Sequence, residues 1–117
     1  MRLLQKLKHP NIVAFKDSFL DRDHYLNLIM SYCEEGDIYS KYKNNSNNPF
    51  SEEIILGWLA QMLLAIHYLH DLKILHRDLK SQNIFIKQGI LRVGDFGIAK
   101  VLENTRDFAN TVIINSV

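Results

Sequence analysis

Two short polar runs carry the residues of this chain that are best suited to chemistry. The first is HRDLKSQN at residues 76–83, and the second is DFG at residues 95–97. The apolar, β-prone residues between them are interrupted by Lys-Gln-Gly, which predicts a hairpin turn. Because a hairpin brings its two ends together, we expect Asp78, Asn83 and Asp95 to converge. Two carboxylates and an amide in one place suit a site for Mg²⁺ and a phosphorylated nucleotide.

The order and spacing of these residues resemble the motifs H-R-D-L-x-x-x-N and D-F-G of protein kinases. Each motif alone is a weak signal, and the alternative is a charged surface turn beside an unrelated turn. The resemblance implies that Asp78 accepts the proton of a substrate hydroxyl and that Lys80 neutralises charge on the moving γ-phosphoryl group. It also implies that Asn83 and Asp95 hold Mg²⁺ against the phosphates of ATP. A basic residue at Lys80 is typical of the serine/threonine kinases.

The same region contains residues that would support the site rather than react. The resemblance implies that His76 packs under Phe96, and Phe96 and Gly97 complete the second motif. Arg77 is expected to pair with a phosphate on the activation loop. Thr111 is a candidate phosphorylation site for that pairing, favoured by its position, and the alternative is an ordinary polar loop residue.

The connector YCEEGD resembles the hinge that binds adenine in kinases. By this resemblance Met30 is the gatekeeper at the back of the adenine pocket, and Phe85 forms the floor. The carbonyl of Ser31 and the N–H of Cys33 would hydrogen-bond adenine, and Asp37 would reach the ribose. The Cys33 side chain can equally be a small apolar residue in a connector.

The elements that must position these residues follow from the rest of the pattern. Leucines at helical spacing in residues 1–8 predict the end of a helix, which Pro10 stops. Residues 12–19 and 25–31 predict two strands that pair as a hairpin, and residues 38–43 predict a short helix. We expect the two strands to form a lone hairpin.

The strongest helix signal begins at Ser51 and ends at about His70. Ser51 is an N-cap, and the two glutamates that follow it favour the positive end of a helix. Apolar residues then recur at spacings of three and four from Ile55 to Leu69, which gives one apolar stripe along a rod of roughly 30 Å. We expect this helix to be the buried spine of a helical lobe.

Composition limits the class of protein. The chain has 117 residues, of which 47% are hydrophobic and 23% charged, and its formal net charge is +1. These values predict one globular domain without a bias towards nucleic acid or an anionic membrane. No uninterrupted apolar run approaches the roughly 20 residues of a membrane span. The one cysteine, Cys33, permits no internal disulfide, which fits a reducing, cytoplasmic setting.

Four longer stretches narrow the resemblance to the NIMA-related (Nek) serine/threonine kinases: KHPNIVAFKDSF, YCEEGDI, ILHRDLKSQNIF and GDFGIAKVL. The fold implied is a partial α+β kinase domain. Residues 1–30 would be a remnant of the N-lobe, residues 31–37 the hinge, and residues 38–117 part of the C-lobe ending inside the activation segment. The cofactors implied are ATP and Mg²⁺, and the partner is a protein substrate phosphorylated on serine or threonine. The family also implies a cytoskeletal or ciliary association.

The sequence departs from the family pattern at both ends. A glycine-rich phosphate loop, a strand lysine and the glutamate that pairs with it are absent from the 117 residues, and the family's Gly-Thr-Pro does not follow Ile113. Without that phosphate cradle we predict that the isolated chain is inactive as a kinase. Two alternatives stay open, namely a non-catalytic fragment that docks to another kinase chain and a truncated gene product.

Overall fold

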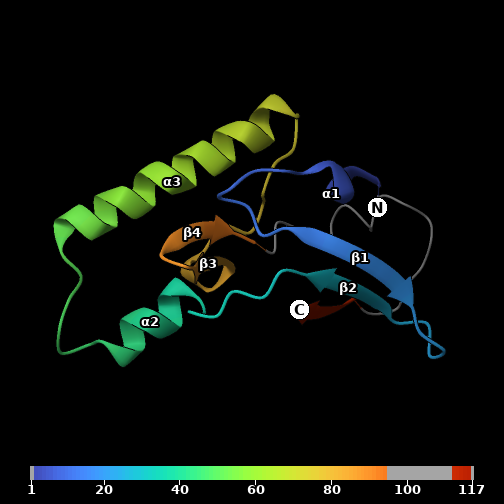
Figure 1. Cartoon of the computed structure of the whole chain (residues 1–117), viewed down its shortest axis with the longest axis horizontal. Coiled ribbons are helices and arrows are strands. Elements are labelled where there is room, and N and C mark those ends of the chain that lie inside the picture. Colours follow the sequence, from blue (N-terminus) through green and yellow to red (C-terminus); the bar gives the residue numbers. More distant parts are fainter. Residues whose placement is uncertain (1, 95–111, 117) are drawn as a thin grey trace.

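The computed structural model describes residues 2–94 and 112–116 of the chain (Figure 1). Within these residues the helices are α1 (Arg2–Lys6), α2 (Ile38–Asn44) and α3 (Glu52–Asp71), and Ser81–Asn83 form a 3-10 turn, η1. The strands are β1 (Phe15–Leu20), β2 (Leu26–Met30), β3 (Ile84–Lys87), β4 (Ile90–Val93) and β5 (Val112–Ser116). The helices and strands predicted up to β4 are confirmed, and their bounds differ from the prediction by at most three residues.

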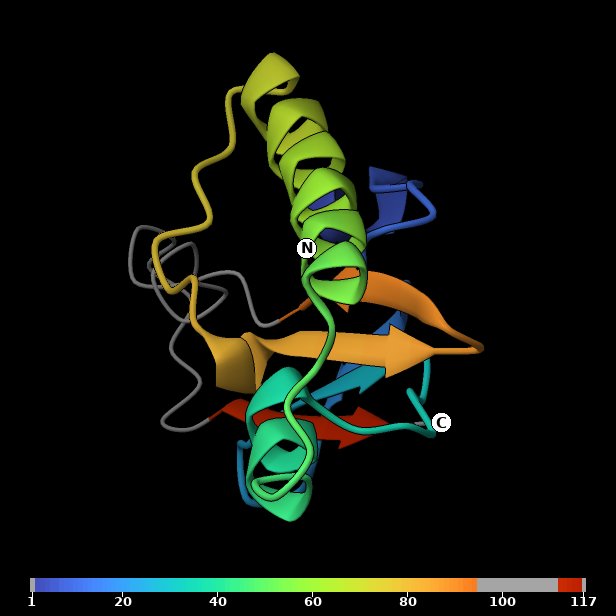
Figure 2. The same ribbon diagram turned by 90° about the vertical axis from the view of Figure 1, so that its left-hand side faces the viewer.

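The strands form two sheets. β1 and β2 pair antiparallel, β5 joins β2 in parallel, and β3 and β4 make a two-stranded antiparallel hairpin. In both views this hairpin lies between α3 and α2 (Figure 1 and Figure 2). The β3–β4 hairpin is therefore the central element of the described residues. The α+β architecture agrees with the predicted fold class.

The pairing of β5 corrects one expectation. We predicted that β1 and β2 stand as a lone hairpin, but β5 lies along β2 with Val112 opposite Leu26 and Ser116 opposite Met30. The edge of a hairpin presents unpaired N–H and C=O groups, which another extended segment can satisfy. The sequence VIINS of β5 begins with three β-branched residues, which favour a strand.

A short segment before β1 joins the two sheets. The Val13 N–H donates to Val93 O at 2.9 Å, and the Val93 N–H donates to Asn11 O at 2.8 Å. Because this segment pairs with β4, β1 begins at Phe15 rather than at the predicted residue 12.

Asn11 ties the same segment to α3. Its side chain is buried, and Nδ2 donates to Leu91 O of β4 and to Gln61 Oε1 of α3, each at 3.0 Å. Gln61 Oε1 also accepts the Leu91 N–H at 2.9 Å. The sequence indicated only that Pro10 stops a helix here, so this polar network emerges from the structure alone.

The start of α3 is as predicted, because the Ser51 hydroxyl accepts the Ile54 N–H at 3.3 Å. The burial of α3 is not as predicted. Leu69 is fully buried, but Leu59 is 43% exposed and Leu63 is 58% exposed. The other labelled elements lie on one side of this helix (Figure 1), so the expectation of a buried spine is wrong for most of its length.

Among the described residues, α3 is also the one helix that is long and apolar enough to cross a membrane. This corrects the expectation drawn from uninterrupted apolar runs, because single polar residues such as Gln61 interrupt the run without making the whole helix polar. The core helices of globular proteins share this composition, and Ala65 and Leu69 of α3 belong to the core.

Candidate functional site

Asp78, Lys80 and Asn83 form one polar cluster in and around η1. Asn83 Nδ2 donates to the Asp78 carbonyl oxygen and to Asp78 Oδ2, at 2.9 Å each. Lys80 Nζ lies 3.2 Å from the same Oδ2, and both side chains of this ion pair are half exposed. The first polar run of the sequence therefore brings a carboxylate, an amide and an ammonium group together.

These partners shift the pKa of Asp78. The hydrogen bond from Lys80 is the largest influence on the pKa of Asp78 and lowers it, partial burial opposes this effect, and the hydrogen bond from Asn83 lowers the pKa further. The pKa of Asp78 consequently lies below its ordinary value. The carboxylate is ionised at neutral pH, which is the state that accepts a hydrogen bond from a hydroxyl group.

His76 connects this cluster to the end of β4. Its Nδ1 accepts the Asp78 N–H at 3.2 Å, and its Nε2 lies 2.9 Å from Gly94 O. Because Nδ1 is an acceptor, these hydrogen bonds assign the proton to Nε2, which donates to Gly94. The Gly94 N–H donates to Asn83 O at 2.9 Å. The residue that precedes Asp95 is therefore held by the cluster on two sides.

Several predicted site residues lie outside the described residues, namely Asp95, Phe96, Gly97 and Thr111. Of the three residues expected to converge, the structure shows the contact between Asp78 and Asn83. Arg77, which we expect to pair with a loop phosphate, is exposed and has a φ of 66°. Such a left-handed backbone is uncommon for a residue other than glycine and is typical of functional loops.

A cavity of about 300 Å³ adjoins the polar cluster. Its lining includes all five residues that the sequence predicted for nucleotide binding, which are Met30, Ser31, Cys33, Asp37 and Phe85. Gly94 lines the cavity as well. The cavity and the polar cluster therefore meet at Gly94.

Five further residues line the cavity. Tyr32, Glu34 and Gly36 belong to the connector predicted as the hinge, but no contact with the nucleotide was predicted for them. The sequence did not mark Val13 or Gly94 as part of the lining. Gly94 has a steric role there, because a Cβ atom at this position would lie 3.0 Å from Phe85 Cε2 and 3.0 Å from Val13 Cγ2. A glycine that precedes DFG is visible in the sequence, but the two side chains that approach it belong to other elements.

The predicted adenine contacts are main-chain groups of the hinge, at Ser31 and Cys33, and both residues line the cavity. The Ser31 N–H donates to Ala14 O at 2.8 Å, and the contacts of the Ser31 carbonyl and the Cys33 N–H with adenine stay predictions. The Cys33 thiol lies 3.9 Å from Ser31 O. Burial raises the pKa of this thiol, against the opposing charges of Arg92 and Lys87, so it is neutral at physiological pH.

Asp37 has a structural role that the sequence reading left out. Its carboxylate accepts the Ser40 N–H and the Ser40 hydroxyl, at 2.8 Å each, and thereby caps the N-terminus of α2. Burial raises the pKa of Asp37, but the two hydrogen bonds from Ser40, together with those from the main chain of Asp37 and Tyr39, bring the pKa below its ordinary value. The predicted contact with ribose therefore involves a carboxylate that already has two donors.

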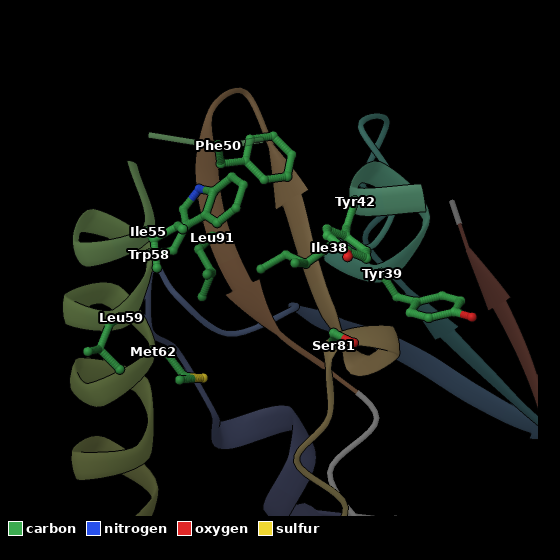
Figure 3. Close-up of a pocket in the computed structure, with 10 residues that line it drawn as sticks. All are labelled: Ile38, Tyr39, Tyr42, Phe50, Ile55, Trp58, Leu59, Met62, Ser81 and Leu91. Carbon is green, nitrogen blue, oxygen red and sulfur yellow. The ribbon is translucent and has the colours of Figure 1, made fainter. Parts of the chain in front are cut away.

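A larger cavity of about 400 Å³ lies between α2 and α3 (Figure 3). Its lining is almost wholly apolar and includes Ile38, Met62 and Trp58, whose ring meets that of Phe50 edge-on at 4.9 Å. Ser81 is the residue of the polar run that reaches it. None of its described lining residues carries a carboxylate or an ammonium group, so it is not suited to phosphate chemistry despite its size.

Comparison with known proteins agrees with this geometry. The family described as "Protein kinase domain" matches residues 1–116. The chain is similar to serine/threonine-protein kinase Nek4 of Mus musculus, with 47% identity over 113 residues that cover 96% of this chain and 14% of the relative. It is also similar to serine/threonine-protein kinase Nek5 of Homo sapiens, with 47% identity over 113 residues that cover 95% of this chain and 16% of the relative. The chain thus spans less than a fifth of the length of these relatives. The chain belongs to the protein kinase family, and the part of the kinase domain that it contains is of the Nek type.

Proposed function

We propose that the 300 Å³ cavity binds ATP, and that the adjoining cluster positions a serine or threonine hydroxyl of a protein substrate for phosphorylation. The observation that carries this proposal is the position of Gly94. It lines the cavity, and its backbone is hydrogen-bonded to Asn83 and His76 of the cluster. The polar cluster is therefore fixed at the edge of the cavity.

The chemistry of the lining supports a nucleotide. A volume of about 300 Å³ falls at the lower end of the range for small-molecule sites. Val13, Met30 and Phe85 provide apolar surface for an aromatic base, and the hinge provides main-chain donors and acceptors.

The donor set also supports Mg²⁺. Asn83 uses Nδ2 for both hydrogen bonds to Asp78, so Oδ1 is the atom that it would offer to a cation. Mg²⁺ prefers such oxygen ligands. Asp95, the neighbour of Gly94 in the sequence, would supply a carboxylate oxygen.

The roles of the residues follow from phosphoryl-transfer chemistry. When bound, Mg·ATP would supply the γ-phosphoryl group, with ADP as the leaving group. Asp78 would orient the substrate hydroxyl through a hydrogen bond and accept its proton as the oxygen attacks in line. Lys80 would neutralise charge on the group in transfer, and Asn83 keeps the Asp78 carboxylate in place.

The test is a titration of the 117-residue chain with a fluorescent ATP analogue, with and without Mg²⁺. We expect saturable binding that Phe85→Ala weakens in both conditions, whereas Asn83→Ala removes the Mg²⁺ dependence and leaves binding of adenosine unchanged. A chain that shows no saturable binding at millimolar nucleotide would contradict the proposal. We also predict that the isolated chain does not phosphorylate proteins, and phosphorylation that Asp78→Ala abolishes would show this prediction to be wrong.

The exposed side of α3 favours a second candidate function, which is docking to another kinase chain without catalysis. Leu56, Leu63 and Leu64 are each more than half exposed, and contiguous apolar surface of this kind marks interaction sites. This function predicts a complex with a kinase chain that forms equally with and without ATP. In sedimentation experiments Leu63→Glu should abolish such a complex, and Asp78→Ala should leave it intact.

A further inference from the structure

Two consecutive glutamates of the hinge reach across to the turn between β3 and β4. Glu34 Oε1 accepts the Gln88 N–H at 2.7 Å, and Glu35 Oε1 accepts the Gly89 N–H at 2.7 Å. Both distances are at the short end of the range for hydrogen bonds to charged acceptors. The partners are 54 positions apart in the sequence, so these are tertiary contacts between two separate elements.

The two carboxylates accept N–H groups of the turn that the β3–β4 ladder does not pair. Gln88 and Gly89 have φ angles of 51° and 72°, the pattern of a two-residue type I′ loop, and the flanking Lys87 and Ile90 pair with each other. The N–H groups of the two loop residues therefore lie outside the ladder of β3 and β4. Gln88 adopts a left-handed conformation that is unfavourable for a residue with a side chain, and the hydrogen bond to Glu34 holds it there.

Glu35 extends the contact to a third element. Its other oxygen, Oε2, accepts Lys41 Nζ of α2 at 2.7 Å. This hydrogen bond is the largest cause that lowers the pKa of Glu35, followed by the one from Gly89. The main-chain N–H of Glu34 itself lowers the pKa of Glu34 most, followed by the N–H of Gln88 and the charge of Lys87, whereas burial and the charge of Glu35 oppose this effect. Both side chains are carboxylates at neutral pH.

The elements that the glutamates connect are two walls of the cavity. The hinge provides Cys33, Glu34 and Gly36, and β3 provides Phe85. Main-chain hydrogen bonds also join the hinge to β3. The Glu35 N–H donates to Ile86 O at 3.3 Å, and the Ile86 N–H donates to Gly36 O at 3.0 Å. Main-chain groups and the two carboxylates thus join the hinge to the hairpin that carries Phe85.

We propose that Glu34 and Glu35 are positioning residues that clamp the hinge to the β3–β4 turn and thereby set the affinity of the cavity for adenine nucleotides. This inference rests on the proposed function of the cavity. It adds two residues that act through the shape of the site, without touching the reacting atoms.

The experiment compares three paired variants of the 117-residue chain. E34A/E35A removes both acceptors. E34Q/E35Q removes the two charges but keeps an amide oxygen at each position, so it should recover part of the contact. E52A/E53A removes a matched pair of consecutive glutamates at the start of α3, which do not line the cavity.

The first measurement is hydrogen exchange of the Gln88 and Gly89 amides by NMR. The substitutions are distant in sequence from the turn, so they leave the intrinsic exchange rates of these amides unchanged. We expect exchange about tenfold faster in E34A/E35A, an intermediate rate in E34Q/E35Q and no change in E52A/E53A. Unchanged exchange in E34A/E35A would overturn the clamp itself.

The second measurement is the rate at which a neutral alkylating reagent labels Cys33. This residue is the one cysteine of the chain, and it is buried at the cavity wall. We expect E34A/E35A to label several-fold faster than E34Q/E35Q. E34A/E35A and E34Q/E35Q remove the same charge beside the thiol, so the difference between their labelling rates reports the lost hydrogen bonds. Equal labelling of the two pairs and the wild type would show that the clamp does not control the hinge.

The third measurement is the Kd for an ATP analogue. We expect E34A/E35A to bind several-fold to tenfold more weakly, with E34Q/E35Q in between. If the wild type and E34A/E35A bind equally, the inference is wrong and the proposed function stands. If the wild type binds no nucleotide, the proposed function is wrong, and so is the proposed effect of the clamp on nucleotide affinity. Hydrogen exchange of the turn and labelling of Cys33 then still decide whether the clamp exists.

Discussion

Asn83 holds Asp78 at two atoms, because its amide nitrogen lies 2.9 Å from the Asp78 carbonyl oxygen and 2.9 Å from Asp78 Oδ2. The Asn83 side chain thus fixes both the backbone and the carboxylate of Asp78. Asn83 is buried, whereas the Asp78 side chain is half exposed. The buried residue supports the site, and the exposed residue is accessible to a substrate.

Asn83→Ala should destabilise the chain, since it removes two hydrogen bonds of a buried side chain. We expect a loss of about 1–3 kcal/mol in the free energy of unfolding, measured by urea denaturation. Asn47→Ala is the matched control, because Asn47 is exposed on the Asn-rich segment and its truncation should cost less than about 0.5 kcal/mol. Equal losses in the two variants would mean that the contact with Asp78 is not stabilising.

Lys80→Met should raise the pKa of Asp78, because the hydrogen bond from Lys80 is the largest cause of its low value. A titration of the Asp78 carboxyl carbon by NMR measures this shift, with Lys6→Met as the control. A lowered pKa stabilises the folded chain above the unfolded-state pKa, and this stabilisation is lost as the pH falls through the folded-state pKa. The unfolding free energies of wild type and Lys80→Met should therefore differ near neutral pH and converge in acid. An unshifted Asp78 titration would rule out the ion pair.

Gly94→Ala should disturb the cavity, because the new Cβ would lie 3.0 Å from side-chain atoms of Phe85 and Val13. We expect destabilisation of about 1–3 kcal/mol together with weaker nucleotide binding. Gly57→Ala is the control, since a Cβ there meets nothing within 4 Å and an alanine within α3 should stabilise by about 0.5–1 kcal/mol. Thermal unfolding should show a lower midpoint for Gly94→Ala and a higher midpoint for Gly57→Ala than for the wild type. A stabilised Gly94→Ala would refute the steric role of Gly94.

Leu69→Ala and Leu63→Ala separate the two sides of α3. Leu69 is fully buried, so its truncation should cost about 2–5 kcal/mol. Leu63 is 58% exposed, and its truncation should stay within about 1 kcal/mol. Urea denaturation of both variants provides the measurement. A large loss for Leu63→Ala would show that the exposed side is covered in solution.

The local elements and the family could be predicted from the sequence. The N-cap of Ser51 and the presence of a turn at residues 87–89 depend on interactions within a few residues, which neighbouring side chains specify. The polar run that contains Asp78 and Asn83 could be predicted because its motif is continuous in the chain. Five of the residues that line the smaller cavity could be predicted from the resemblance to kinases, and the others required the structure.

Contacts between distant segments required the tertiary structure. The glutamates at 34 and 35 look like an ordinary charged connector in the sequence, and their hydrogen bonds to the β3–β4 turn exist only because folding places the two side by side. The same holds for Asn11 and Gln61, for the steric role of Gly94, and for the strand β5 on the edge of β2. The apolar stripe of α3 was visible in the sequence, but its burial depends on which surfaces meet it. Local sequence determines the type of element, while packing decides which of its faces leave water and which polar groups find partners.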